Sequence, residues 1–67
     1  MGKISEWELW ACAQHYIRNH GADAPILAAM RADELLDQGD MAGARAFQQI
    51  VIRIEQLLET PEGVVLN

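Results

Sequence analysis

The stretch that decides the fold is residues 47–58, FQQIVIRIEQLL. On a helix that turns by about 100° per residue, its large apolar side chains fall on one arc and its glutamines fall outside that arc. The arc consists of Phe47, Ile50, Val51, Ile54, Leu57 and Leu58. A helix with such a stripe is stable in water only when the stripe is covered. We therefore interpret the residues before it as the elements that cover it.

The chain has 67 residues, of which 51% are hydrophobic. This apolar fraction excludes a disordered chain, and the length leaves room for one domain, residues 1–67, with one core. We expect the ordered core to span about residues 5–60. Whether the tail at 61–67 packs or frays stays open. A core of this size supplies about 3–5 kcal/mol of stability, which keeps self-association open as well.

A first helix is predicted over residues 6–20. Ser5 and Glu8 match a capping box, in which each side chain satisfies a free amide of the first turn. Gly21 supplies the left-handed residue on which helices commonly end. His20, in the last turn and on the apolar stripe of the helix, is expected to hydrogen-bond free carbonyls and to favour the negative end of the helix dipole.

A second helix is predicted over residues 24–38, with Asp23 as its N-cap and Gly39 as its end. Pro25 falls in the first turn, where its missing amide hydrogen has no cost. The apolar arc of this helix is mostly alanine and consists of Pro25, Ala28, Ala29, Ala32, Leu35 and Leu36. Small residues let a neighbouring helix approach closely, so we expect this arc to face the third helix.

A third helix is predicted over residues 41–59, with Asp40 as its N-cap directly after Gly39. So short a connection makes neighbouring helices pack on each other. Gly43 costs the helix about 1 kcal/mol relative to alanine, which predicts a close contact at this position. Pro61 ends the helix. Together these elements predict an all-α fold, a compact three-helix bundle.

Several short motifs of the chain resemble a family of short, all-helical bacterial proteins of unknown function. The resemblance covers residues 8–58 and rests on Glu8-Leu9-Trp10-Ala11-Cys12-Ala13, His20-Gly21, Arg31-Ala32-Asp33-Glu34-Leu35-Leu36, Gly39-Asp40, Arg53-Ile54 and Leu57. It implies a small standalone helical protein and assigns no site. A weaker likeness to a tetratricopeptide helix pair, from Gly39-Asp40-Met41 and Ala44 onward, is not accepted because Gln48 stands where that repeat has a large residue.

The charge of the chain is −5, and it gathers in the middle. Residues 23–40 hold five acids against one Arg, while the five Lys and Arg residues of the chain are scattered singly. Nucleic-acid affinity depends largely on clustered Lys and Arg that neutralise phosphates, so we disfavour nucleic-acid binding. Arg45 and Arg53 are interpreted as solvated side chains, with pairing to the acids of the second helix as an alternative.

Three residues are candidate metal ligands: Cys12, His15 and His20. Structural zinc sites usually draw paired ligands from two segments, and these residues come from one, so we prefer the interpretation of a buried cysteine and two unrelated histidines. The sequence has no paired carboxylates, nucleophile with base, or glycine-rich phosphate loop. We therefore expect no enzyme activity and no cofactor.

Four large apolar residues are candidates for contact with a partner: Trp7, Met30, Met41 and Ile52. Ile52 lies opposite the stripe of its helix, with Met41 on the same side, and the pair suggests a second contact surface and hence a homodimer. Trp7 has two interpretations, an aromatic staple over the helix start or an anchor for a partner. Trp10, three residues on, is interpreted as core.

The expected setting is the cytoplasm. The lone Cys12 cannot form a disulfide within the chain. The first residues lack the apolar run of a signal peptide, and no later segment approaches the roughly 20 apolar residues that cross a membrane. The sequence thus predicts a small soluble interaction or accessory protein with an unknown protein partner. A helix-turn-helix regulator and, behind it, a small metal-binding protein remain the alternatives.

Overall fold

The computed structural model describes residues 5–59, which are helical almost throughout. The elements are α1 (Glu6–His20), a 3-10 turn η1 (Gly21–Asp23), α2 (Ala24–Asp37) and α3 (Met41–Glu59). No strand occurs within 5–59, which confirms the predicted all-α class. The predictions made for the tail at 61–67 and for the stop at Pro61 lie outside the described residues.

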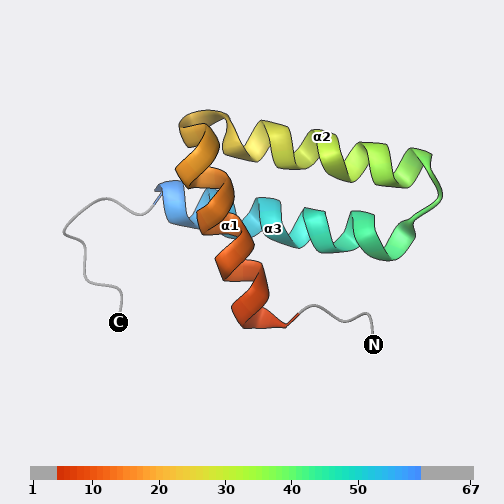
Figure 1. Ribbon diagram of the computed structural model, residues 1–67, viewed down its shortest axis with the longest axis horizontal. Coiled ribbons are helices and arrows are strands. Elements are labelled where there is room, and N and C mark those ends of the chain that lie inside the picture. Colours follow the sequence, from red (N-terminus) through yellow and green to blue (C-terminus); the bar gives the residue numbers. More distant parts are fainter. Residues whose placement is uncertain (1–4, 60–67) are drawn as a thin grey trace.

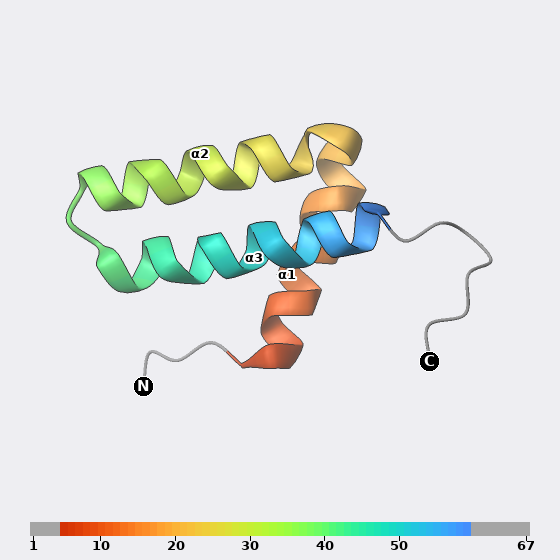
Figure 2. The same cartoon turned by 180° about the vertical axis from the view of Figure 1, so that it is seen from behind.

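The three helices are arranged as a hairpin and a crossing arm (Figure 1). Helices α2 and α3 run antiparallel and side by side, and α1 crosses the half of α3 that ends at Glu59. Seen from behind, α3 lies in front of α1, so α1 lies against one face of the hairpin, across the second half of α3 (Figure 2). Because α1, η1 and α2 follow one another without a gap, they form one long bent helical run. The predicted compact three-helix bundle is therefore not confirmed.

The bend between α1 and α2 is made at Gly21. Its φ of 58° and ψ of −129° lie in a region that side chains with a Cβ avoid. Its amide donates to the carbonyl of Ile17, and the amide of Ala24 donates back to the carbonyl of Gly21. The predicted N-cap role of Asp23 is wrong, because this residue is already in helical conformation and its side chain makes no cap hydrogen bond. The 3-10 turn η1 leads directly into α2 and takes the place of a side-chain cap.

The start of α1 is held by the predicted capping box. The amide of Glu8 donates to Ser5 Oγ at 3.2 Å, and the amide of Ser5 donates to Glu8 Oε1 at 2.9 Å. Two free amides of the helix start are thereby satisfied by side chains.

Removing this cap is expected to weaken the protein measurably. Ser5→Ala should lower the free energy of unfolding by about 1 kcal/mol, because the amide of Glu8 loses its acceptor. Urea unfolding followed by circular dichroism at 222 nm gives the value. Ser5→Asp, which keeps an acceptor at the same position, is the control and should stay close to the parent protein. Equal loss in both variants would contradict a capping role.

The turn between α2 and α3 combines a helix end with a helix start. Gly39, at φ 84°, donates its amide to the carbonyl of Leu36 at 3.0 Å, and Asp40 donates its amide to the carbonyl of Leu35 at 2.8 Å, the pattern of a Schellman motif. Asp40 Oδ1 then accepts from the amide of Gly43 at 2.9 Å. Both roles agree with the sequence prediction. The close contact predicted at Gly43 exists as well, since a Cβ there would lie 2.5 Å from the Asp40 carboxylate.

One hydrophobic core draws side chains from all three helices. Its buried members are Leu9, Ala13, Ala24, Ala28, Ile50 and Ile54. Partly buried side chains surround them: Cys12, Tyr16, Ile17, Phe47, Val51 and Leu57. Three alanines of α2 are buried, which agrees with the prediction that the small residues of this helix allow a close approach.

Two leucines predicted to be covered are exposed instead. Leu58 is 44% exposed, because α3 is longer than the helix beside it. At about 1.5 Å per residue, the 19 residues of α3 span roughly 28 Å and the 14 residues of α2 roughly 21 Å. The two helices are joined at the far end, so the last turn of α3 projects beyond the start of α2. Leu36 is also exposed, while its neighbour Leu35 takes the buried position.

Candidate interaction surfaces

The contact between α1 and α3 is built around Arg53. Its side chain is only 14% exposed, its Nη2 donates to Glu6 Oε2 at 2.6 Å, and its Cζ lies 5.2 Å from the ring centroid of Trp10. Arg53 is therefore not the solvated residue that the sequence suggested, and its carboxylate partner belongs to the first helix rather than the second. Trp10, interpreted from the sequence as core, is only partly buried and is not among the core side chains of residues 5–59; the Arg53 guanidinium lies over its ring instead. The cluster acts as a clamp between the two helices.

The clamp predicts a selective effect of charge removal along α3. Arg53→Gln should lower the free energy of unfolding by about 1 kcal/mol, since it removes both the cation over Trp10 and an ion pair whose carboxylate partner, Glu6, is exposed. Arg45→Gln, an exposed position of the same helix, should change it little. Urea unfolding measures both. In a Trp7→Phe background, Trp10 emission should also shift in the Arg53 variant alone, and an unshifted spectrum would argue against the contact.

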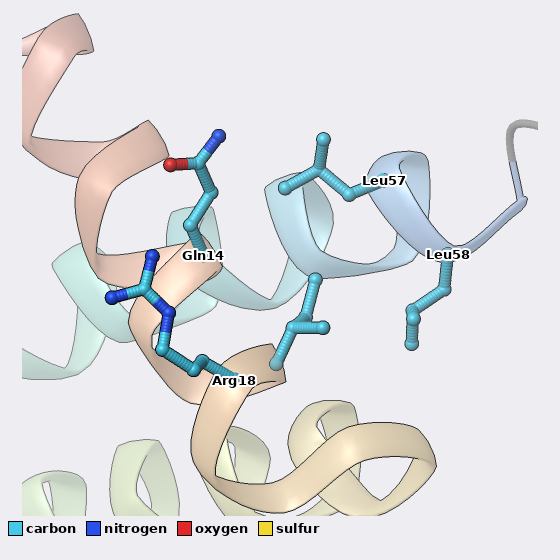
Figure 3. Close-up of a pocket in the computed structure, with 5 residues that line it drawn as sticks. Gln14, Arg18, Leu57 and Leu58 are labelled. Carbon is cyan, nitrogen blue, oxygen red and sulfur yellow. The ribbon is translucent and has the colours of Figure 1, made fainter.

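A first groove opens between the second half of α1 and the end of α3 (Figure 3). It is about 560 Å³ in volume and is lined by Gln14, Ile17, Arg18, Leu57 and Leu58. Gln14 and Arg18 project from α1, while Leu57 and Leu58 come from the last turns of α3. The groove is therefore apolar at one wall and carries one cation at the other. This is where Leu58 lies instead of in the core.

A second groove lies along the hairpin, between α2 and α3. It is about 290 Å³ in volume and is lined by Ala29, Ala32 and Asp33 from α2 and by Gln48, Val51 and Ile52 from α3. Val51 and Arg53 are two positions apart, so their side chains leave α3 in nearly opposite directions. Because Arg53 contacts α1, this hairpin groove lies on the face of the hairpin that α1 leaves open.

The four partner candidates are all exposed, but they do not form one patch. Ile52, 43% exposed, lines the hairpin groove, and Met41 lies three turns earlier on the same side of α3. Met30 is exposed on α2 without lining either groove. Trp7 is 76% exposed in the first turns of α1, so it does not act as a staple over the helix start.

Sequence reasoning missed how the groove walls are composed. Ala29, Ala32 and Val51 were assigned to the covered faces of their helices, yet all three also line the hairpin groove. In the sequence, Asp33 is distinguished only as one of the five acids of residues 23–40. Ala29 and Ala32 could have indicated the groove, because two small residues beside larger neighbours leave a depression in a helix surface.

The three candidate metal ligands have different environments and do not form a cluster within residues 5–59. Cys12 is partly buried against the core, and the carbonyl of His15 accepts from Asn19 Nδ2 at 2.8 Å on the exposed side. The ring of His20 packs 5.6 Å from that of Tyr16. Within residues 5–59, no group of three His, Cys, Asp or Glu side chains is arranged to hold a metal ion.

His20 lies in the last turn of α1 as predicted, but its predicted place on the apolar stripe and its predicted hydrogen bond to free carbonyls are both wrong. It is exposed rather than central to the apolar stripe, and within residues 5–59 no hydrogen bond joins its ring to a helix carbonyl. The chain bends directly after His20, and the side chain at this last position of α1 is exposed. The Tyr16 ring, which also packs edge-on against Phe47 at 6.0 Å, takes the inner position.

Helix lengths and hydropathy within residues 5–59 give one further finding. None of the helices there combines the length and the apolar character that a membrane span requires.

Within residues 5–59, these features define a small all-helical protein with open grooves between its helices. A family model matches residues 5–62, and the chain belongs to that family, DUF6961, a family of unknown function. The match includes every helix described above and agrees with the resemblance noted from the sequence. No curated protein and no solved structure matches the chain. Membership in this family therefore brings no assigned activity.

Proposed function

We propose that the protein is a non-enzymatic interaction or accessory protein that binds another protein through the open face of the α2–α3 hairpin. The observation that carries this proposal is the hairpin groove, whose walls combine Ala29, Ala32, Val51 and Ile52 from two helices. An apolar groove bounded by polar side chains on a soluble domain is typical of a site for another protein.

The distribution of exposed side chains supports this proposal. Within residues 5–59, the exposed large apolar residues are Trp7, Ile26, Met30, Leu36, Met41, Ile52 and Leu58. Single exposed apolar residues are ordinary. Here, however, Leu36 lies two turns after Ala29 on α2, and Met41 lies three turns before Ile52 on α3, so both extend the apolar surface on the side of the groove.

The placement of the arginines favours a protein partner over nucleic acid. Within residues 5–59, Arg53 is paired with Glu6 and Arg31 with Glu34 at 3.0 Å. An arginine that is already neutralised by a carboxylate contributes little to phosphate binding. This supports the interaction protein over the helix-turn-helix alternative, which a gel shift at low salt would test.

Two finer points belong to the same proposal. The three helices act as one bundle-like unit, because a single core takes side chains from each of them. The setting is the cytoplasm, supported by a lone, partly buried cysteine that has no second thiol for an intrachain disulfide.

A position-specific crosslink in living cells tests the proposal. A photo-crosslinking amino acid at position 52, in place of Ile52, is expected to give one discrete product larger than the chain. The same group at Gln49, exposed on the same helix but outside the groove, serves as the matched control and should give none. If position 52 fails to crosslink in cells of the source organism, the proposed binding through the hairpin groove is wrong.

A further inference from the structure

We infer that the hairpin groove binds a basic amphipathic helix of another protein. This inference rests on the proposed function and names the chemical class of the partner. Its first support is shape, since the groove runs between two antiparallel helices and one wall is formed by the small side chains of Ala29 and Ala32. A helix laid along such a groove inserts apolar anchors at positions i, i+3 or i+4, and i+7.

Charge decides which helix fits. Asp33 lines the groove and takes no part in an ion pair within residues 5–59. Asp37 follows one turn later on α2, and Glu55 lies one turn beyond Val51 and Ile52 on α3. Arg45, one turn before Gln48, is the basic residue nearest the groove along α3. Three acids against one arginine favour a partner that carries Lys or Arg beside its apolar anchors.

The same charges disfavour a second copy of the chain as the occupant. A twofold dimer across this face would bring two surfaces together that each carry Asp33, Asp37 and Glu55, and each chain has a net charge of −5. Like charges brought together at an interface oppose association. The homodimer suggested by Ile52 and Met41 is therefore the less favoured occupant of this surface.

The test uses the whole chain and two designed peptides. Both peptides are amphipathic helices with leucine anchors at i, i+4 and i+7, and they differ only in having lysines or glutamates beside the anchors. Fluorescence anisotropy of labelled peptide gives affinity, and amide chemical-shift changes in the protein locate the site. We expect the lysine peptide to bind at least about tenfold tighter at low salt, with much of the difference lost at high salt. Shifts should map to the groove residues of α2 and α3.

Two charge-reversed variants separate the groove from the overall charge of the protein. Asp33→Lys should weaken binding of the lysine peptide about tenfold, whereas Asp23→Lys, an exposed site at the bend with the same change in net charge, should alter it little. Circular dichroism shows whether both variants fold. A third variant, Ile52→Ala, should lower the affinity of the protein for both peptides, because it removes part of an apolar wall of the groove.

The outcomes distinguish this inference from the proposed function. Three results would each contradict the inference of a basic helical partner. The first is equal binding of both peptides, and the second is an equal effect of the two charge reversals. The third is a dimer, detected by light scattering, whose chemical-shift changes cover the groove. If the peptide test fails but position 52 still crosslinks to a partner in cells, the proposed function is supported and only the inference of a basic helix is wrong. If neither the crosslink nor the peptide binding is observed, both are wrong.

Discussion

Ile54→Ala is expected to leave much of the protein unfolded at room temperature. The side chain of Ile54 is fully buried, at 0% exposure, in the core shared by all three helices. Truncating a buried isoleucine to alanine costs about 2–5 kcal/mol, and a domain of this size has only about 3–5 kcal/mol from its core. The cost is therefore comparable with the whole stability. The helical signal at 222 nm and its urea dependence measure the loss.

The matched control for Ile54 is Ile52, two positions away on the same helix. Ile52→Ala makes the same chemical change at a side chain that is 43% exposed, so it should cost less than about 1 kcal/mol. The pair compares burial alone, since residue type and helix are held constant. Similar losses at both positions would mean that α3 does not present the face described here to α1 and α2.

Ala28→Leu is expected to have the second-largest effect. Ala28, on α2, is fully buried in the core that also contains Ile50 and Ile54 of α3, and a leucine there has no space without moving one helix. Adding side-chain carbons to a packed core costs about 1–3 kcal/mol, so the midpoint of thermal unfolding should fall by several degrees. Differential scanning calorimetry or a circular dichroism melt gives the shift.

Its neighbour supplies the control. Ala29→Leu adds the same atoms one position later, where the side chain is exposed and lines the hairpin groove. The free energy of unfolding should change little, because the helix propensity of leucine is only slightly lower than that of alanine. The same variant should block peptide binding, because the added side chain fills the groove. A stable Ala28→Leu protein would show that α2 and α3 are not in close contact at this point.

The clamp at Arg53 links the fold to the proposed binding surface. By pairing with Glu6 and lying over Trp10, this residue holds α1 on one face of the hairpin. Helix α1 therefore covers the side of α3 that carries Ile50 and Ile54, while the side that carries Ile52 stays uncovered. The groove is open because α1 is the one helix of residues 5–59 that packs against the α2–α3 hairpin, and it packs on the other face.

Local features of the chain were predictable from the sequence. The starts and ends of α1, α2 and α3 agree with the predictions to within one residue, because caps, glycines at positive φ and apolar periodicity act over a few neighbouring residues. The capping box at Ser5 and the turn at Gly39 and Asp40 are of this kind. The N-cap role predicted for Asp23 was wrong because η1 continues α1 into α2, so that Asp23 is itself helical and the amide of Ala24 donates to the carbonyl of Gly21.

The candidate site was predicted only in part. Ile52 was singled out as an exposed apolar residue on the side opposite the stripe, and it does line a groove. Its companions in the walls and the buried position of Arg53 were not predicted. Periodicity shows which residues share a face of one helix, but it does not show how far the neighbouring helix extends or where a third helix crosses.

By itself, the sequence determined three helices, their limits, and an apolar stripe on α3 that other helices must cover, because each of these follows from interactions within one or two helical turns. The tertiary structure alone decided that α1 crosses the hairpin, that Arg53 is enclosed by Glu6 and Trp10, and that Leu58 extends past the cover. These outcomes depend on relative lengths and on the bend at Gly21. They arise between residues far apart in the chain, whose contacts are set by how whole helices fit together.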